Sequence, residues 1–142
     1  MMRFLSESID QSKSRSVVEP ALRQLAERFE TLWHRAHGAR GEHACARLAG
    51  ETLIFSLENV LTTAQRSWAG TDEGYASLVR TMAQQVDVIY PQLADQIETV
   101  LHCYVGAMYV EVEPENGTLH IKFQLRDAPR ALYQEQLPTS CR

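Results

Sequence analysis

A long apolar stripe in the second half of the chain constrains the fold more than any other feature. Between residues 72 and 104, apolar side chains recur at intervals of three or four, the repeat of one face of an α-helix. These residues are Tyr75, Val79, Met82, Val86, Ile89, Leu93, Ile97, Val100 and Tyr104. Pro91 lies within the stripe and removes the hydrogen bond to the Asp87 carbonyl. The pattern therefore predicts one long helix that bends at Pro91.

A second amphipathic helix is predicted over residues 17–37. Its apolar side chains recur with the same helical repeat. They are Val18, Leu22, Leu25, Phe29, Leu32 and Ala36. Pro20 fits the first turn, where a missing N–H loses no helical hydrogen bond, and Gly38 favours the helix end. The preceding residues 1–16 are polar and rich in serine, which predicts a flexible lead-in.

Two β-hairpins are predicted, one after each of these helices. In the first, residues 43–49 and 52–58 alternate between apolar and polar side chains. In the second, residues 105–112 and 118–125 flank an Asn-Gly dipeptide, which favours a tight turn. Each pair of strands is close enough in sequence to form an antiparallel ladder.

A short helix completes the predicted order, which is α-ββ-α-α-ββ. Thr62 or Thr63 can cap this helix before the long one begins. Two hairpins most simply form one antiparallel sheet, with the amphipathic helices covering one face. The sequence thus predicts a two-layer α+β sandwich as a single domain over residues 17–126. We expect a flexible tail at residues 127–142.

Composition and charge narrow the classes of partner. The formal net charge of -4 argues against a nucleic-acid-binding protein, which usually carries a basic stripe. The first ten residues, MMRFLSESID, are too polar for the apolar region of a secretory signal. The chain also lacks the run of about 18 apolar residues that spans a bilayer. We expect a cytoplasmic protein with no nucleic-acid partner and no direct membrane insertion.

Three histidines near the first helix end form a candidate metal site. His34 and His37 are three positions apart and share a helix face, and His43 follows across the turn. Imidazole ligands would suit zinc. The spacing matches no standard zinc signature, and surface histidines at a helix end are the favoured interpretation. We therefore expect no cofactor, with a small metalloprotein kept as an alternative.

Arginines around the same turn form a candidate anion site. Arg40, Arg47 and Arg80 could converge there, because a guanidinium binds carboxylates and phosphates with two parallel hydrogen bonds. Gly38 and Gly41 would let backbone N–H groups approach an anion. The alternative is that each arginine pairs with a nearby surface carboxylate. If the arginines do converge, the chain would be a small-anion or nucleotide sensor.

An apolar strand face provides a candidate interface. If Met108, Val110 and Val112 point away from the helices, they form an exposed patch suited to a second copy or another protein. The alternative is that one chain covers both sheet faces. The first of these interpretations predicts a homodimer.

No set of residues in the sequence forms a recognisable catalytic signature. Cys103 has His102 beside it, but neighbouring residues in a helix point in different directions, so the pair cannot easily act together. We therefore expect a protein without enzymatic activity and without catalytic residues.

The stretch from residue 37 to residue 68, followed by the long helix, resembles the MpsC family. The family pattern has a Gly/Arg turn, a strand leading to a Leu-Thr exit, and an arginine in the long helix. The matching residues are Gly38, Arg40 and Gly41 in the turn, Leu57, Leu61 and Thr62 at the strand exit, and Arg80 in the helix. The resemblance covers roughly residues 17–126.

The resemblance implies a partner and a cellular context. The family is associated with a Na⁺-translocating, membrane-potential-generating system whose membrane components are similar to inorganic-carbon (bicarbonate/CO2) uptake machinery. The small family member looks like an accessory or regulatory protein, with no established catalytic residues. We expect such a protein to act by contact with a membrane transport component, from a cytoplasmic position peripheral to that complex.

Overall fold

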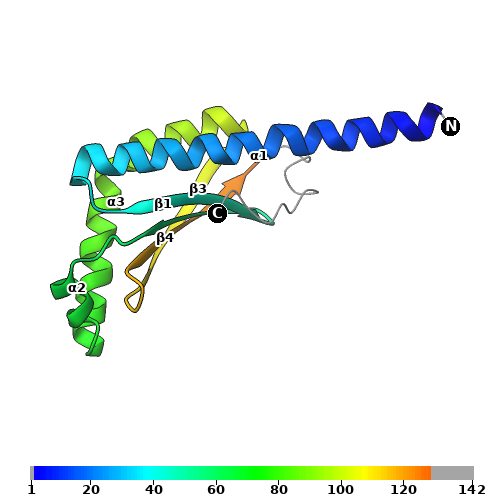
Figure 1. Cartoon of the computed structure of the whole chain (residues 1–142). Helices are drawn as coiled ribbons and strands as arrows, with labels where there is room; N and C mark the ends of the chain where they lie inside the picture. The colour runs from blue at the N-terminus through cyan, green and yellow to red at the C-terminus, as the bar shows by residue number, and fades with distance from the viewer. Residues whose placement is uncertain (1, 129–142) are drawn as a thin grey trace.

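The helices and hairpins follow one another in the predicted order. The computed structural model describes the backbone of residues 2–128 and the side chains of residues 18–128. The elements are α1 (Met2–His37), β1 (Glu42–Ala49), β2 (Thr52–Glu58), α2 (Thr63–Trp68), α3 (Asp72–Leu101), β3 (Tyr104–Glu113) and β4 (Thr118–Arg126). This order confirms the predicted α-ββ-α-α-ββ arrangement. Figure 1 shows the long helices packed with the sheet.

The two hairpins join into one antiparallel sheet with the strand order β1-β2-β4-β3. Strands β2 and β4 lie in the centre, where Leu53 pairs with Phe123 and Phe55 pairs with Ile121. These four side chains have no exposed surface, since they point towards the helices. We refer to this side as the inner face of the sheet, and to the opposite side as the outer face. The two-layer α+β prediction is confirmed.

Helix α3 changes direction along its length, as the proline predicts. Pro91 lies inside the helix, and Figure 1 shows a first half that runs beside α2 and a second half that lies alongside α1. Proline cannot donate the hydrogen bond to the Asp87 carbonyl, and this missing bond allows the helix to bend between its two halves. The bend places residues from both long helices next to each other.

Helix α1 begins much earlier than the sequence predicts. It starts at Met2, so residues 2–16, expected to be a flexible lead-in, are helical. Pro20 accordingly lies inside the helix and not in its first turn. No glycine or proline precedes Pro20 to end a helix, and the ring of Pro20 is exposed. The first part of α1 extends past the sheet (Figure 1).

The buried stripe of α1 follows the prediction as far as Phe29 and then shifts by one position. Trp33 is 1% exposed, whereas Leu32 is half-buried and Ala36 is exposed. The Trp33 ring packs edge-on against Phe29 at a centroid distance of 6.3 Å and lies 4.6 Å from the His37 ring. The large indole therefore replaces the two predicted aliphatic positions as the last anchor of this helix.

The buried stripe of α3 also differs from the prediction at both ends. Its buried side chains are Leu78, Met82, Val86, Ile89, Leu93, Ile97 and Leu101. Val79 and Val100 are half-buried, and Tyr75 is 38% exposed. The helix stops at Leu101 because His102 takes a left-handed conformation with φ 54°. The last predicted helical residue, Tyr104, is instead 63% exposed at the start of β3.

The predicted outward-facing patch on β3 is wrong in its direction. Met108, Val110 and Val112 pair with residues of β4 that lie on the inner face, so all three point towards the helices. Val112 is 5% exposed, and Met108 and Val110 are half-buried against the core. Side chains alternate between the faces of a strand, and the register of β3 against β4 decides which face these three occupy.

The end of the domain lies slightly beyond the predicted boundary. Asp127 has a positive φ of 56°, and Ala128 after it is 8% exposed and belongs to the core. Residue 128 thus packs with the domain and is not part of a free tail. The remainder of the predicted tail, residues 129–142, lies outside the described residues.

Candidate binding groove between the two long helices

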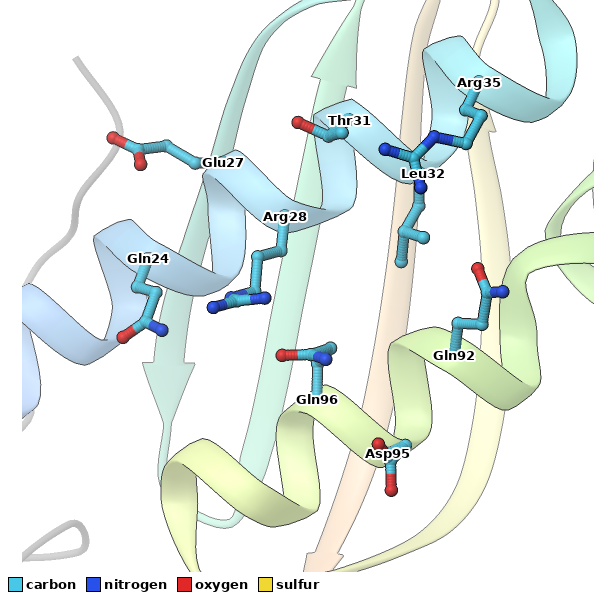
Figure 2. A pocket seen from close by; sticks show the side chains of 9 residues that line it. All are labelled: Gln24, Glu27, Arg28, Thr31, Leu32, Arg35, Gln92, Asp95 and Gln96. Carbon is cyan, nitrogen blue, oxygen red and sulfur yellow. The ribbon is translucent and has the colours of Figure 1, made fainter.

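A polar groove of about 600 Å³ runs between α1 and the second half of α3. We name it the α1–α3 groove. Its lining residues, shown in Figure 2, are Gln24, Glu27, Arg28, Thr31, Leu32, Arg35, Gln92, Asp95 and Gln96. A volume of this size lies within the usual range for binding clefts, about 300–1,000 Å³.

The helical repeat explains how these residues come to line one groove. Gln24, Arg28 and Leu32 are four positions apart on α1, so they lie one above another on a single face. On α3, Gln92 and Gln96 have the same spacing and follow directly after the bend. The inner sides of both helices are buried in the core, so these faces meet on the side away from the sheet.

The groove contains two guanidinium groups without a carboxylate partner. Figure 2 shows Arg28 and Arg35 directed towards α3, whereas the carboxylate of Glu27 points away. Arg28 donates hydrogen bonds to the amide oxygen of its groove neighbour Gln24, at 3.2 Å from Nη2 and 3.3 Å from Nε. Among residues 18–128, the structure shows no ion pair for either arginine. The groove can therefore receive negative charge.

The arginines predicted from the sequence lie on three different segments of the chain. Arg40 is exposed in the turn after α1, Arg47 is exposed on the edge strand β1, and Arg80 is exposed on the first half of α3. None of them lines the α1–α3 groove or the smaller pocket at the end of α3. The cationic site lies on a different face from the predicted one.

Two glycines shape the turn after α1. Gly38 and Gly41 have positive φ angles of 92° and 107°, respectively. The Gly38 N–H donates to the His34 carbonyl at 2.9 Å and ends the helix. The Gly41 carbonyl accepts a hydrogen bond from His34 Nε2 at 2.6 Å. These two hydrogen bonds thus join the turn to its own helix.

The three candidate metal ligands have separate partners. His34 bonds to the Gly41 carbonyl, and His37 Nε2 donates to the Gln85 carbonyl at 2.7 Å. His43 Nδ1 lies 3.5 Å from Glu58 Oε1 on β2. Within the part of the chain that the structure describes, no group of three or more His, Cys, Asp or Glu side chains is placed to hold a metal ion. The structure does not bring the three histidines together.

A hydrogen-bonded network crosses the outer face of the sheet. Ser56 Oγ lies 2.7 Å from His120 Nδ1, and His120 Nε2 lies 2.9 Å from Glu113 Oε1. Asn116 donates to the other oxygen of Glu113 at 3.0 Å. Hydrogen bonds from Asn116 and His120 lower the pKa of the Glu113 carboxyl. The network links β2, β4 and β3, and the pairing of Ser56 with His120 follows from the strand register.

The thiol of Cys103 is not poised to act as a nucleophile. Cys103 is 5% exposed and packs in the core beside a pocket of about 310 Å³. Burial, followed by the negative charge of Glu98, raises the pKa of this thiol to about 11. The reactive thiolate is therefore a small fraction of the total at neutral pH.

Cys103 is expected to react slowly with iodoacetamide in the folded protein at pH 8. A pKa raised from 9.0 to about 11 lowers the thiolate fraction about 100-fold, and burial slows access further. Peptide mass spectrometry after timed alkylation, with and without denaturant, measures this ratio at Cys103. Alkylation at equal rates in the folded and denatured protein would contradict the protected, protonated thiol.

The pairing of Arg28 with Arg35 and the glutamines opposite them were not predicted from the sequence, although a signal was present. Arg28 and Arg35 are seven positions apart on a predicted helix, and seven residues make about two turns. That spacing places both on one face. The sequence does not show which other helix lies opposite that face, and without Gln92 and Gln96 two surface arginines define no site.

The structure is thus a two-layer α+β fold with a groove between its two long helices that is lined in part by Arg28 and Arg35. The model of the family described as Na⁺-translocating membrane potential-generating system (MpsC) matches residues 19–127, which is well over half of the chain. The chain therefore belongs to the MpsC family, as its turn and strand motifs suggest. No curated protein and no solved structure matches the chain significantly.

The matched region contains the whole α1–α3 groove, since its lining residues lie between 24 and 96. Within residues 2–128, no helix has both the length and the apolar character needed to cross a bilayer.

Proposed function

We propose that this protein is an accessory component of a Na⁺-translocating, membrane-potential-generating system and acts by binding a membrane-embedded component of that system. In this role the chain has no reaction of its own to catalyse. It works from the cytoplasmic side and alters the assembly or activity of its partner. As expected from the sequence, the proposal includes a homodimer as the acting form.

The observation that supports this proposal is the family match from residue 19 to residue 127. The matched region includes α1 from residue 19 onwards, the whole of α3 and the entire sheet. The α1–α3 groove adds a surface that suits contact with another molecule, because its two arginines lack carboxylate partners. Both guanidiniums are exposed to solvent, where they can form paired hydrogen bonds with a carboxylate of a bound molecule.

Affinity purification of the tagged full-length chain from detergent-solubilised membranes is expected to recover a component of the cation-translocating system. Cells lacking the protein should show a lower membrane potential, measured with a voltage-sensitive dye, and the wild-type gene should restore it. A protein with the same tag and a similar negative charge is the control. Normal potential in the deletion strain, together with no recovery of a transport component, would refute the proposal.

The anion-sensing alternative now depends on different residues. Arg28 and Arg35 line the α1–α3 groove, whereas Arg40, Arg47 and Arg80 line neither this groove nor the smaller pocket at the end of α3. A free anion or nucleotide would therefore be expected in the α1–α3 groove. The experiment in the next section separates a small anion from a protein partner.

A further inference from the structure

The shape of the α1–α3 groove is elongated along the helices. Its lining on α1 extends from Gln24 to Arg35, which corresponds to about 16 Å at the helical rise of 1.5 Å per residue. Three turns of α1 thus contribute to one continuous surface. A compact ion would occupy only a small part of it.

We propose that the α1–α3 groove binds an acidic amphipathic helix of the partner protein. This inference rests on the proposed function and specifies the partner's chemistry at the contact. The bound helix lies along the groove on the side of α1 and α3 away from the sheet. There it forms a third helix against the two that line the groove.

The spacing of the two arginines supports a helical partner. Arg28 and Arg35 are seven residues apart, which places them about 10.5 Å apart along the axis of α1. A second α-helix lying nearly parallel or antiparallel repeats its own side chains at the same interval. Two acidic residues at positions i and i+7 of the partner would therefore face both guanidiniums at once.

The residues between the arginines define the rest of the contact. The Leu32 side chain is half-buried between them and offers an apolar surface for one aliphatic side chain of the partner. From α3, Gln92 and Gln96 point towards α1 in Figure 2 and can donate amide hydrogen bonds to partner carboxylates. Asp95 lies at the rim, where it favours a basic or amide side chain on the partner's flank.

The partner helix is thus specified by charge complementarity. It carries Asp or Glu at two positions seven apart, an aliphatic residue between them, and a basic or amide residue on the side facing α3. Such a helix interacts with groove cations that have no internal ion pair. Complementary charges of this kind contribute mainly to specificity and to the rate of association.

Charge reversal in the groove tests the inference with the full chain. The variant R28E/R35E reverses both groove charges, whereas R23E/R40E reverses two exposed arginines that do not line the groove. We expect R28E/R35E to recover at least about tenfold less of the membrane component, since attraction becomes repulsion at two positions. We expect R23E/R40E to behave like the wild type. Circular dichroism and thermal unfolding check that all three proteins fold.

A photo-crosslinking residue placed at Thr31, on the groove rim, identifies the contacted segment. We expect the crosslink to lie in an acidic helical segment of the membrane component. Equal recovery by all three proteins, or a crosslink to a segment that is neither acidic nor helical, would overturn the inference. In that case the recovered component still supports the proposed function. Failure of the wild type to recover any transport component would remove both.

Thermal unfolding with inorganic phosphate, bicarbonate or ATP tests the small-anion occupant. The comparison uses sodium chloride at matched ionic strength. No shift specific to these anions is expected if the groove binds a protein helix. A stabilisation that depends on Arg28 and Arg35, and that displaces the membrane component, would replace the helix by a free anion as the occupant.

Discussion

Replacement of Gly41 by alanine is expected to lower the free energy of unfolding by about 3 kcal/mol. Gly41 has φ +107°, a conformation that costs any L-residue about 1–3 kcal/mol. An added Cβ would also lie 2.7 Å from Leu57 Cδ2 and 3.4 Å from Trp33 Cδ1. Leu57 has no exposed surface, so it has no open space to move into. Backbone strain and overpacking therefore act together.

Gly38→Ala is the matched control for this prediction. Gly38 also has a positive φ, +92°, but a Cβ there would meet nothing within 4 Å. Only the backbone strain remains, and we expect a loss of about 1 kcal/mol. Equilibrium urea unfolding of both variants measures the difference. Equal losses at the two positions would show that the contact with Leu57 is not the cause.

This pair of glycines explains the motif that marks the family resemblance. The turn containing Gly38 and Gly41 is shaped by helix termination, by the His34 hydrogen bond and by close packing on Leu57. Each of these requirements is structural. The turn motif is therefore accounted for by the fold, and Arg40 within it is exposed.

The order and type of the elements could be predicted because their signals are local. The Thr62 capping box, the helix end at Gly38 and the Asn-Gly turn each depend on a few neighbouring residues. The predicted strands 52–58 and 118–125 differ from the observed ones by at most one residue. Alternating apolar residues on β4 also fixed which of its faces is buried.

The buried residues near the helix ends were harder to predict because they depend on tertiary packing. Trp33 replaces Leu32 and Ala36 in the core, and Leu101 replaces Val100. In each case the predicted neighbour lies only one or a few positions away on the helix. The packing of the core decides which residue is buried, and in α1 the Phe29 ring contacts the Trp33 indole.

The binding groove could not be predicted because it is formed by two helices distant in sequence. Arg28 and Gln96 become neighbours only when α3 bends and its second half lies along α1 (Figures 1 and 2). Charged residues that are close in sequence suggest a common site, but the helices and strands can place them on different parts of the fold. The candidate ligands His34, His37 and His43 are likewise separated: the rings of His34 and His37 bond to backbone carbonyls, and the ring of His43 lies beside the Glu58 carboxylate.

Replacement of Phe55 by alanine is expected to cause the largest loss of stability, about 3–5 kcal/mol. Phe55 has no exposed surface and lies at the centre of the sheet on its inner face. Its ring is 5.1 Å from Phe29 of α1 and 5.9 Å from Phe123 of β4, and Phe123 in turn stacks on Tyr90 of α3 at 6.2 Å. Truncation would open a cavity between the two layers.

Two comparisons determine whether this aromatic contact holds the layers together. Phe55→Leu keeps most of the volume and should lose about 1.5 kcal/mol, and Tyr109→Ala removes an aromatic ring that is 58% exposed and should lose no more than about 0.5 kcal/mol. Equilibrium urea unfolding measures all three variants. A loss below about 1 kcal/mol for Phe55→Ala would contradict a tightly packed interlayer core. Phe29, which contacts the Phe55 ring, directly follows the groove residue Arg28 in α1. The same cavity should therefore also loosen the position of Arg28 and weaken partner binding.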